Sequence, residues 1–99
     1  MDLSIYAPRD GQLTVYSKSG CPNCSKVKTF LKDKYVKFVV VDCDDYILQD
    51  KTRFLTVIQQ LSGTNPKTFP FIFDRKTFIG GFAETIKYLD RLFDFDLSF

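Results

Sequence analysis

The sequence predicts a single α/β domain, with the element order β-α-β-α-β-β-α and a four-stranded mixed sheet flanked by helices. One observation is that a strand, a helix and a second strand follow one another within about thirty residues, the length of a right-handed βαβ unit. Another is a tight hairpin followed by a last helix. The chain has 99 residues, 44% of them hydrophobic and 16% aromatic, which excludes a disordered chain and suffices for one modest core.

The first half of the chain contains the βαβ pattern. Residues 12–17 are β-branched and aromatic, which predicts a buried strand. Residues 24–34 carry apolar side chains at helical spacing (Val27, Phe30 and Leu31), with lysines on the other face. The unbroken apolar run within residues 37–42 predicts a second strand, parallel to the first and covered on both faces.

The second half of the chain predicts two helices around a hairpin. A helix is expected over residues 51–61, with Gly63 as its stop. Short strands are expected near residues 71–74 and 77–79, because the polar residues between them are typical of a tight turn. A last helix is expected over residues 83–93.

Residues 1–11 are interpreted as a short N-terminal leader, residues 12–93 as the domain and residues 94–99 as a C-terminal tail. The start has no basic region and no sufficient apolar stretch, so no secretory signal is visible, and no apolar run approaches a membrane span. We therefore expect a cytoplasmic, reducing location and no membrane partner. The net charge of +2 gives no reason to expect a nucleic-acid partner, and a monomer is expected.

The sequence Cys21-Pro22-Asn23-Cys24 stands at the junction between the first strand and the first helix. Three interpretations of this pair remain open. A zinc site needs about four ligands, but the chain has no His and only three cysteines. A purely structural pair is uncommon in a reducing compartment. The third interpretation, redox exchange, is favoured because a C-x-x-C pair inside a βαβ pattern is typical of it, so no metal is expected.

The two thiols are predicted to have different roles. Cys21 is expected at the exposed start of the turn, where Lys18 and the N–H groups of the helix terminus stabilise a thiolate. Cys21 is therefore the predicted nucleophile and Cys24, inside the first helical turn, the resolving thiol. Pro22 suits the first helical position. Cys43 is interpreted as a buried small hydrophobe, with a regulatory thiol as the alternative.

Three segments resemble the signature segments of the dithiol glutaredoxins, in the same order. They are Tyr16-Ser17-Lys18-Ser19-Gly20-Cys21-Pro22-Asn23-Cys24, Thr68-Phe69-Pro70 and Gly80-Gly81. The resemblance covers residues 12–93 and implies a thioredoxin-like fold of the glutaredoxin type, with glutathione as the reductant.

The resemblance also implies a binding groove for glutathione. Pro70 is expected to be cis, with the Phe69 backbone next to Thr68 pairing with the cysteinyl unit of the peptide. Lys18 and Lys67 are the implied partners of the glycine carboxylate, and two basic residues of the next helix are further candidates (Lys51 and Arg53).

The other end of the peptide falls at the start of the last helix. Gly81 is expected to let the chain turn closely, and the N–H groups of Phe82 and Ala83 to receive the γ-glutamyl carboxylate. Where the family usually has a small or thiol residue and then acidic or hydroxyl residues, this chain has Phe82-Ala83-Glu84. Glu84 is therefore the candidate partner of the γ-glutamyl ammonium group.

The resemblance implies an enzyme that reduces protein disulfides and glutathione mixed disulfides. The implied partners are glutathione and proteins that contain a disulfide or are glutathionylated. Ribonucleotide reductase is one candidate among these proteins. Two alternatives stay open. One is a thioredoxin-like reductase supplied by thioredoxin reductase. The other is a non-catalytic module, either an iron–sulfur carrier, which Pro22 disfavours, or an interaction scaffold.

Overall fold

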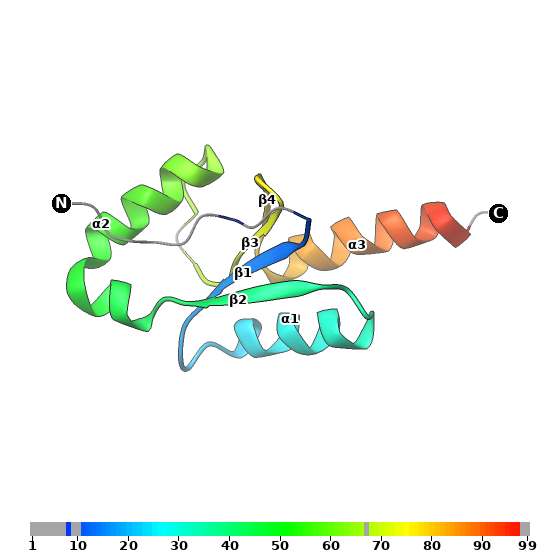
Figure 1. Cartoon of the computed structure of the whole chain (residues 1–99), viewed down its shortest axis with the longest axis horizontal. Helices are drawn as coiled ribbons and strands as arrows, with labels where there is room; N and C mark the ends of the chain where they lie inside the picture. The colour runs from blue at the N-terminus through cyan, green and yellow to red at the C-terminus, as the bar shows by residue number, and fades with distance from the viewer. Residues whose placement is uncertain (1–7, 9–10, 67, 98–99) are drawn as a thin grey trace.

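The computed structural model describes residue 8, residues 11–66 and residues 68–97 of the chain. Its elements follow the predicted order (Figure 1): β1 (Leu13–Ser17), α1 (Pro22–Asp33), β2 (Phe38–Asp42), α2 (Asp44–Ser62), β3 (Phe71–Asp74), β4 (Thr77–Gly80) and α3 (Phe82–Leu97). The predicted α/β class and the four-stranded mixed sheet are confirmed.

The sheet has the strand order β2-β1-β3-β4. Strand β1 pairs with β2 in parallel and with β3 in antiparallel register, and β3 pairs with β4 as the predicted hairpin. Every residue of β1 is buried, so β1 forms the centre of the domain. Because parallel β1 and β2 end at the same edge, the segments that follow them, which hold Cys21 and Cys43, lie at one end of the sheet.

Alternation along the strands divides the core into two layers. Tyr16, Phe71 and Phe73 lie on one face and pack with residues of α2, whereas Val15 and Ile72 lie on the other face. That second face packs with buried residues of α1 and α3 (Val27, Leu31 and Leu89). The sheet is therefore covered by α2 on one side and by α1 and α3 on the other, as Figure 1 shows.

The second strand is less completely covered than its apolar run predicts. Strand β2 lies at the edge of the sheet, and although Val41 and Phe38 pack into the two core clusters, Val40 is 41% exposed. The apolar run from Phe38 to Val41 cannot by itself show an edge position, because interior and edge strands are both rich in β-branched residues.

The helices begin or end at different residues from those predicted. Helix α1 begins at Pro22, and α2 begins at Asp44 with a non-helical residue, Asp50 (φ −164°, ψ 91°), inside it. The Asp50 carboxylate accepts a hydrogen bond from the Arg53 backbone N–H at 3.0 Å, so the predicted helix from Lys51 is the second part of α2. Helix α3 continues to Leu97, through part of the predicted tail.

The domain limits remain a prediction, since nearly all of the leader lies outside the described residues. Within the part of the chain that the structure describes, none of the helices combines the length and the apolar character that a membrane span needs.

Candidate active site

The Cys21–Cys24 pair lies at the N-terminus of α1. Cys21 is the N-cap residue with extended backbone angles, and Pro22 follows in the first turn, as predicted. The Cys24 backbone N–H donates a hydrogen bond to the Cys21 Sγ at 3.1 Å. The two Cα atoms are 5.2 Å apart and the two sulfurs are bonded in a disulfide. In the reduced protein, the same helix terminus and N–H group favour a thiolate at Cys21.

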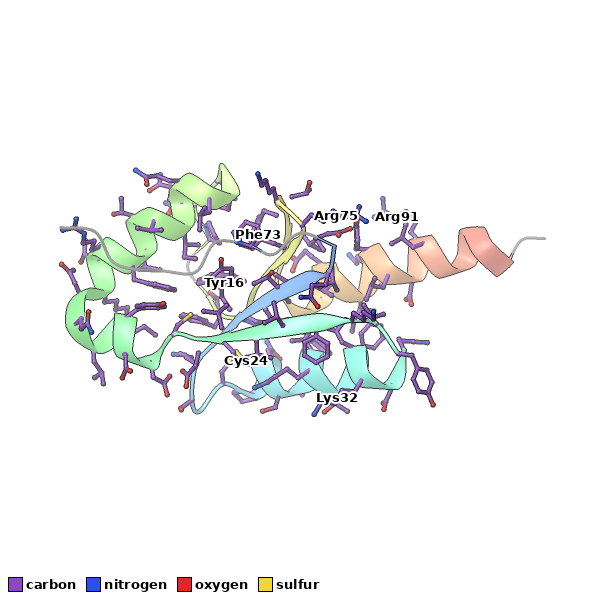
Figure 2. The ribbon with its side chains drawn as sticks, viewed as in Figure 1. Tyr16, Cys24, Lys32, Phe73, Arg75 and Arg91 are labelled. Carbon is purple, nitrogen blue, oxygen red and sulfur yellow. A yellow bond between two sulfur atoms is a disulfide. The ribbon has the colours of Figure 1, made fainter. Side chains whose placement is uncertain are left out.

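Cys21 is less exposed than the sequence predicts. Its side chain is only 8% exposed, against 1% for Cys24, because it packs in the same apolar cluster as Phe54 and Phe69. Cys21 is the more exposed of the two thiols, as expected, but it lines a pocket rather than an open turn. Figure 2 labels Cys24 at the start of α1, close to the end of β1.

A cavity of about 380 Å³, here called the thiol pocket, opens onto Cys21. Its wall contains two of the predicted cations, Lys18 and Lys51. The Lys18 Nζ lies 5.6 Å from the centroid of the Phe69 ring, a cation–π distance. Arg53 does not line this pocket, and Lys67 lies outside the described residues.

Two residues of the Thr68-Phe69-Pro70 segment line the thiol pocket. The Phe69–Pro70 peptide bond is cis, as the resemblance implies. The two residues that line the pocket are Thr68 and Phe69, whereas Pro70 is fully buried and does not line it. The Phe69 ring stacks on Phe54 of α2, with centroids 5.7 Å apart and planes at 4°. Helix α2 therefore fixes the position of Phe69 in the wall of the thiol pocket.

A second cavity, of about 480 Å³ and here called the helix pocket, adjoins the first and shares Asn23, Thr68 and Phe69 with it. Its far wall is the end of β4 and the first turn of α3, from Phe78 to Glu84. The structure therefore brings together the predicted residues from Gly81 to Glu84 at one end of a continuous groove, with Lys18 and Lys51 at the other.

Glu84 has an interaction that the sequence did not predict. Its Oε1 accepts a hydrogen bond from the Gly81 backbone N–H at 3.0 Å, the reciprocal contact of a capping box at the start of α3. The N–H groups of Phe82 and Ala83 belong to the first turn, where a helix supplies no acceptor of its own. These two N–H groups thus remain suited to bind an anion, while Glu84 already caps the helix.

The glycine that the turn requires is Gly80 rather than Gly81. Gly80 has φ +134°, and a Cβ there would lie 2.7 Å from the Glu84 Cβ. We expect Gly80→Ala to lower the free energy of unfolding by about 1–3 kcal/mol, because the backbone and the capping contact must both shift. Urea denaturation measures this change.

Gly81→Ala is the matched control for that prediction. A Cβ at Gly81 meets Glu84 Oε1 at 3.4 Å and the Pro70 carbonyl oxygen at 3.6 Å, which are ordinary contacts. We expect it to destabilise the protein less than Gly80→Ala does; equal losses from the two variants would contradict this assignment.

Hydrogen bonds between Ser19 and Asp44 connect the turn before Cys21 to the start of α2. The Asp44 carboxylate accepts the Ser19 backbone N–H at 2.8 Å and also accepts the Ser19 hydroxyl. These bonds, with Lys18 nearby, lower the pKa of the Asp44 carboxyl. The sequence analysis missed this pair. The sequence does contain a signal for this pair, because Ser19 and Asp44 each follow one of two parallel strands that end at the same edge of the sheet.

Cys43 is fully buried, as predicted, and lies apart from the Cys21–Cys24 pair in sequence but in the same core cluster. Its thiol donates a hydrogen bond to the Val41 carbonyl oxygen at 3.4 Å. Burial raises the pKa of the Cys43 thiol from 9.0 to about 12. The thiol is therefore protonated near neutral pH and unreactive in the folded protein.

We expect iodoacetamide at pH 8 to leave Cys43 unmodified in the reduced native protein and to modify it after denaturation, as mass spectrometry can show. Because the native state holds this proton more tightly than the unfolded state, the corresponding stability is complete below about pH 9 and is lost as pH rises toward 12. The alkaline fall in stability should be shallower for Cys43→Ala; an identical fall would contradict this account.

The sequence analysis also missed several apolar residues of the groove. It assigned none of Phe54, Ile47 and Leu55 to the binding groove, yet all three line the thiol pocket. Their signal in the sequence was only helical periodicity, which does not distinguish a buried residue from one that walls a cavity. Among the described residues, no three His, Cys, Asp or Glu side chains gather in a way that could hold a metal ion.

Comparison with known proteins agrees with this geometry. Residues 13–79 match the family model described as Glutaredoxin. The mitochondrial glutaredoxin-2 of Pongo abelii is 32% identical over 76 residues, covering 77% of this chain and 45% of that protein. Glutaredoxin 1 of Rickettsia conorii is 30% identical over 84 residues, covering 85% of this chain and 71% of that protein.

Solved structures give the same result for the fold. The crystal structure of glutaredoxin 1 from Francisella tularensis superposes with a TM-score of 0.71 at 26% identity, covering 83% of this chain and 95% of that one. The thioredoxin-like fold is therefore confirmed. This chain spans less than half the length of the mitochondrial relative. With the family model matched over most of the domain, the chain belongs to the glutaredoxin family.

Proposed function

We propose that this protein is a glutathione-dependent thiol–disulfide oxidoreductase, with Cys21 as the nucleophile and Cys24 as the resolving thiol. The observation that carries the proposal is the position of Cys21. It is the N-cap of α1, its sulfur accepts the Cys24 N–H at 3.1 Å, and it lies in the wall of the thiol pocket. A thiolate there is stabilised by the helix and faces the space where a substrate binds.

The reaction proceeds by two exchanges and a reduction. The Cys21 thiolate attacks a sulfur of the substrate disulfide, forms a mixed disulfide and releases the other substrate sulfur as a thiolate. Cys24, as its thiolate, then attacks the Cys21 sulfur, which releases the second substrate thiolate and leaves the Cys21–Cys24 disulfide. Two glutathione molecules reduce this disulfide and are oxidised to one glutathione disulfide.

Glutathione lies along the two adjoining pockets. Its glycine carboxylate faces Lys18 and Lys51 in the thiol pocket, with the neighbouring Lys67 as a further candidate. Its cysteinyl unit pairs with the backbone of Phe69. Its γ-glutamyl carboxylate meets the N–H groups of Phe82 and Ala83 in the helix pocket. The substrates are proteins with disulfides or glutathione mixed disulfides, in a reducing, cytoplasmic setting.

A pair of coupled assays tests the proposal. The purified protein is given a glutathionylated peptide, with NADPH as the electron source, and either glutathione with glutathione reductase or thioredoxin reductase alone. We expect turnover in the first assay. Turnover only in the second assay would show that thioredoxin reductase, and not glutathione, supplies the electrons. Absence of turnover in both would exclude the enzymatic function.

A further inference from the structure

A third cavity continues the groove beyond the helix pocket. This basic pocket, of about 250 Å³, lies between β4 and α3, and Lys87, Tyr88 and Arg91 form its α3 side. It shares Phe78, Ile79 and Glu84 with the helix pocket. The three pockets thus follow one another from Cys21 past the start of α3, and glutathione as placed above ends at the second of them.

The lining of the basic pocket carries two positive charges, on Lys87 and Arg91, against one negative charge, on Glu84. Lys87 and Arg91 are exposed and stand one helical turn apart, so both face the same side of α3. Arg75, in the β3–β4 turn, lies near enough to affect the pKa of Tyr88. Figure 2 shows Arg75 and Arg91 labelled in the same part of the molecule, beside α3.

Two carboxylates near these cations already hold hydrogen bonds. Asp74 accepts the hydroxyl of Tyr88, and Glu84 accepts the Gly81 N–H at 3.0 Å. Asp90, also on α3, is exposed and lines none of the three pockets, whereas Lys87 and Arg91 line the basic pocket.

The direction of the groove identifies which part of a substrate reaches this pocket. In glutathione, the γ-glutamyl unit precedes the cysteine and the glycine follows it. A protein substrate that binds in the same direction places the residues preceding its reactive cysteine in the helix pocket and then in the basic pocket. We propose that the basic pocket binds acidic side chains on the N-terminal side of the reactive cysteine in protein substrates. This inference rests on the proposed function.

Helix geometry gives the approximate positions of those acidic residues. Lys87 and Arg91 lie about 6 Å and 12 Å along α3 from Ala83, at a rise of 1.5 Å per residue. An extended peptide advances about 3.3 Å per residue, so these distances correspond to roughly two and four residues. If the residue before the cysteine takes the γ-glutamyl place, the acidic residues stand about three and five positions before the cysteine.

The experiment uses two peptides with one cysteine each, joined by a disulfide to 5-thio-2-nitrobenzoate. One peptide has Glu three and five positions before the cysteine, and the other has Gln there. The Cys21 thiolate of the reduced wild-type protein attacks the peptide sulfur, because the nitrobenzoate thiolate is the better leaving group, and the yellow thiolate is released. No glutathione is required in this step.

We expect the acidic peptide to react about three to ten times faster than the neutral one at low ionic strength, from two exposed charge contacts. Added salt should reduce that ratio. In Lys87→Glu/Arg91→Glu, the ratio should fall to one or below. Lys32→Glu/Lys37→Glu is the matched control, because it changes the net charge equally with exposed residues that line none of the three pockets.

Equal rates for the two wild-type peptides would overturn the inference and leave the proposed function intact. A ratio that survives Lys87→Glu/Arg91→Glu, or that is lost equally in the control, would also overturn it, since the preference would then arise elsewhere or from net charge. Failure of both peptides to react would overturn the proposed function and the inference together.

Discussion

Replacement of Cys21 by Ser is expected to lower the rate of disulfide reduction by at least about 1,000-fold, because an alkoxide is not available at neutral pH to replace the thiolate. Cys21 is the thiol that lines the thiol pocket, whereas Cys24 is 1% exposed within α1. The glutathione-coupled assay with a glutathionylated peptide measures this loss.

Cys43→Ala is the matched control, because it removes the third thiol, which is buried and protonated at neutral pH. We expect this control to keep the wild-type rate. Cys24→Ser separates the two routes: retained turnover of glutathione mixed disulfides indicates a monothiol route, and loss indicates that Cys24 must resolve. Full activity of Cys21→Ser would show that Cys24 is the nucleophile and would contradict the assignment.

Phe54→Ala is expected to lower the free energy of unfolding by about 3–5 kcal/mol, the range for removing a fully buried aromatic ring. Phe54 is fully buried, and its ring contacts Tyr46, Phe69 and Phe71 at centroid distances of 6.0, 5.7 and 6.4 Å. The loss combines the transfer of the ring to water with the cavity left among these three neighbours. Urea denaturation monitored by circular dichroism measures it.

Leu48→Ala, on the same helix, provides the comparison. Leu48 is 84% exposed, so its removal should change stability by less than about 0.5 kcal/mol. Because Phe54 also supports Phe69, Phe54→Ala should raise the KM for glutathione at a temperature where the variant is still folded. A small stability loss for Phe54→Ala, similar to that of Leu48→Ala, would contradict the stacking account.

The elements could be predicted because local patterns determine them. β-branched and aromatic residues identified β1, helical spacing of apolar residues identified α1, and polar turn residues identified the hairpin. Pro22 suited the start of the first helix and Gly63 the end of the second, as the structure has them. The fold followed from the order of these elements, since a strand, helix and strand of this length form a right-handed parallel unit. The Cys21–Cys24 pair could be recognised as a candidate site from its place at the start of a predicted helix alone.

The remaining features depend on contacts between residues far apart in the sequence. The burial of Cys21 arises from Phe54 and Phe69. The edge position of β2 depends on which side of β1 the later hairpin joins. The capping role of Glu84 could be recognised only from the position of Gly81 in space. In the sequence, Glu84 could be interpreted equally well as a residue that contacts the ligand. No single-residue pattern contains this information.

The bond between Ser19 and Asp44 has a consequence for how a substrate could affect the thiol. Asp44 lies on the short first part of α2, before the break at Asp50, and Ile47 on that same short part forms a wall of the thiol pocket. Asp44 and Ile47 lie about one helical turn apart, so the same six residues, 44–49, hold the turn before Cys21 and form part of the wall of the thiol pocket. A ligand that displaced this short segment would act on the turn before Cys21 through the Ser19–Asp44 bond.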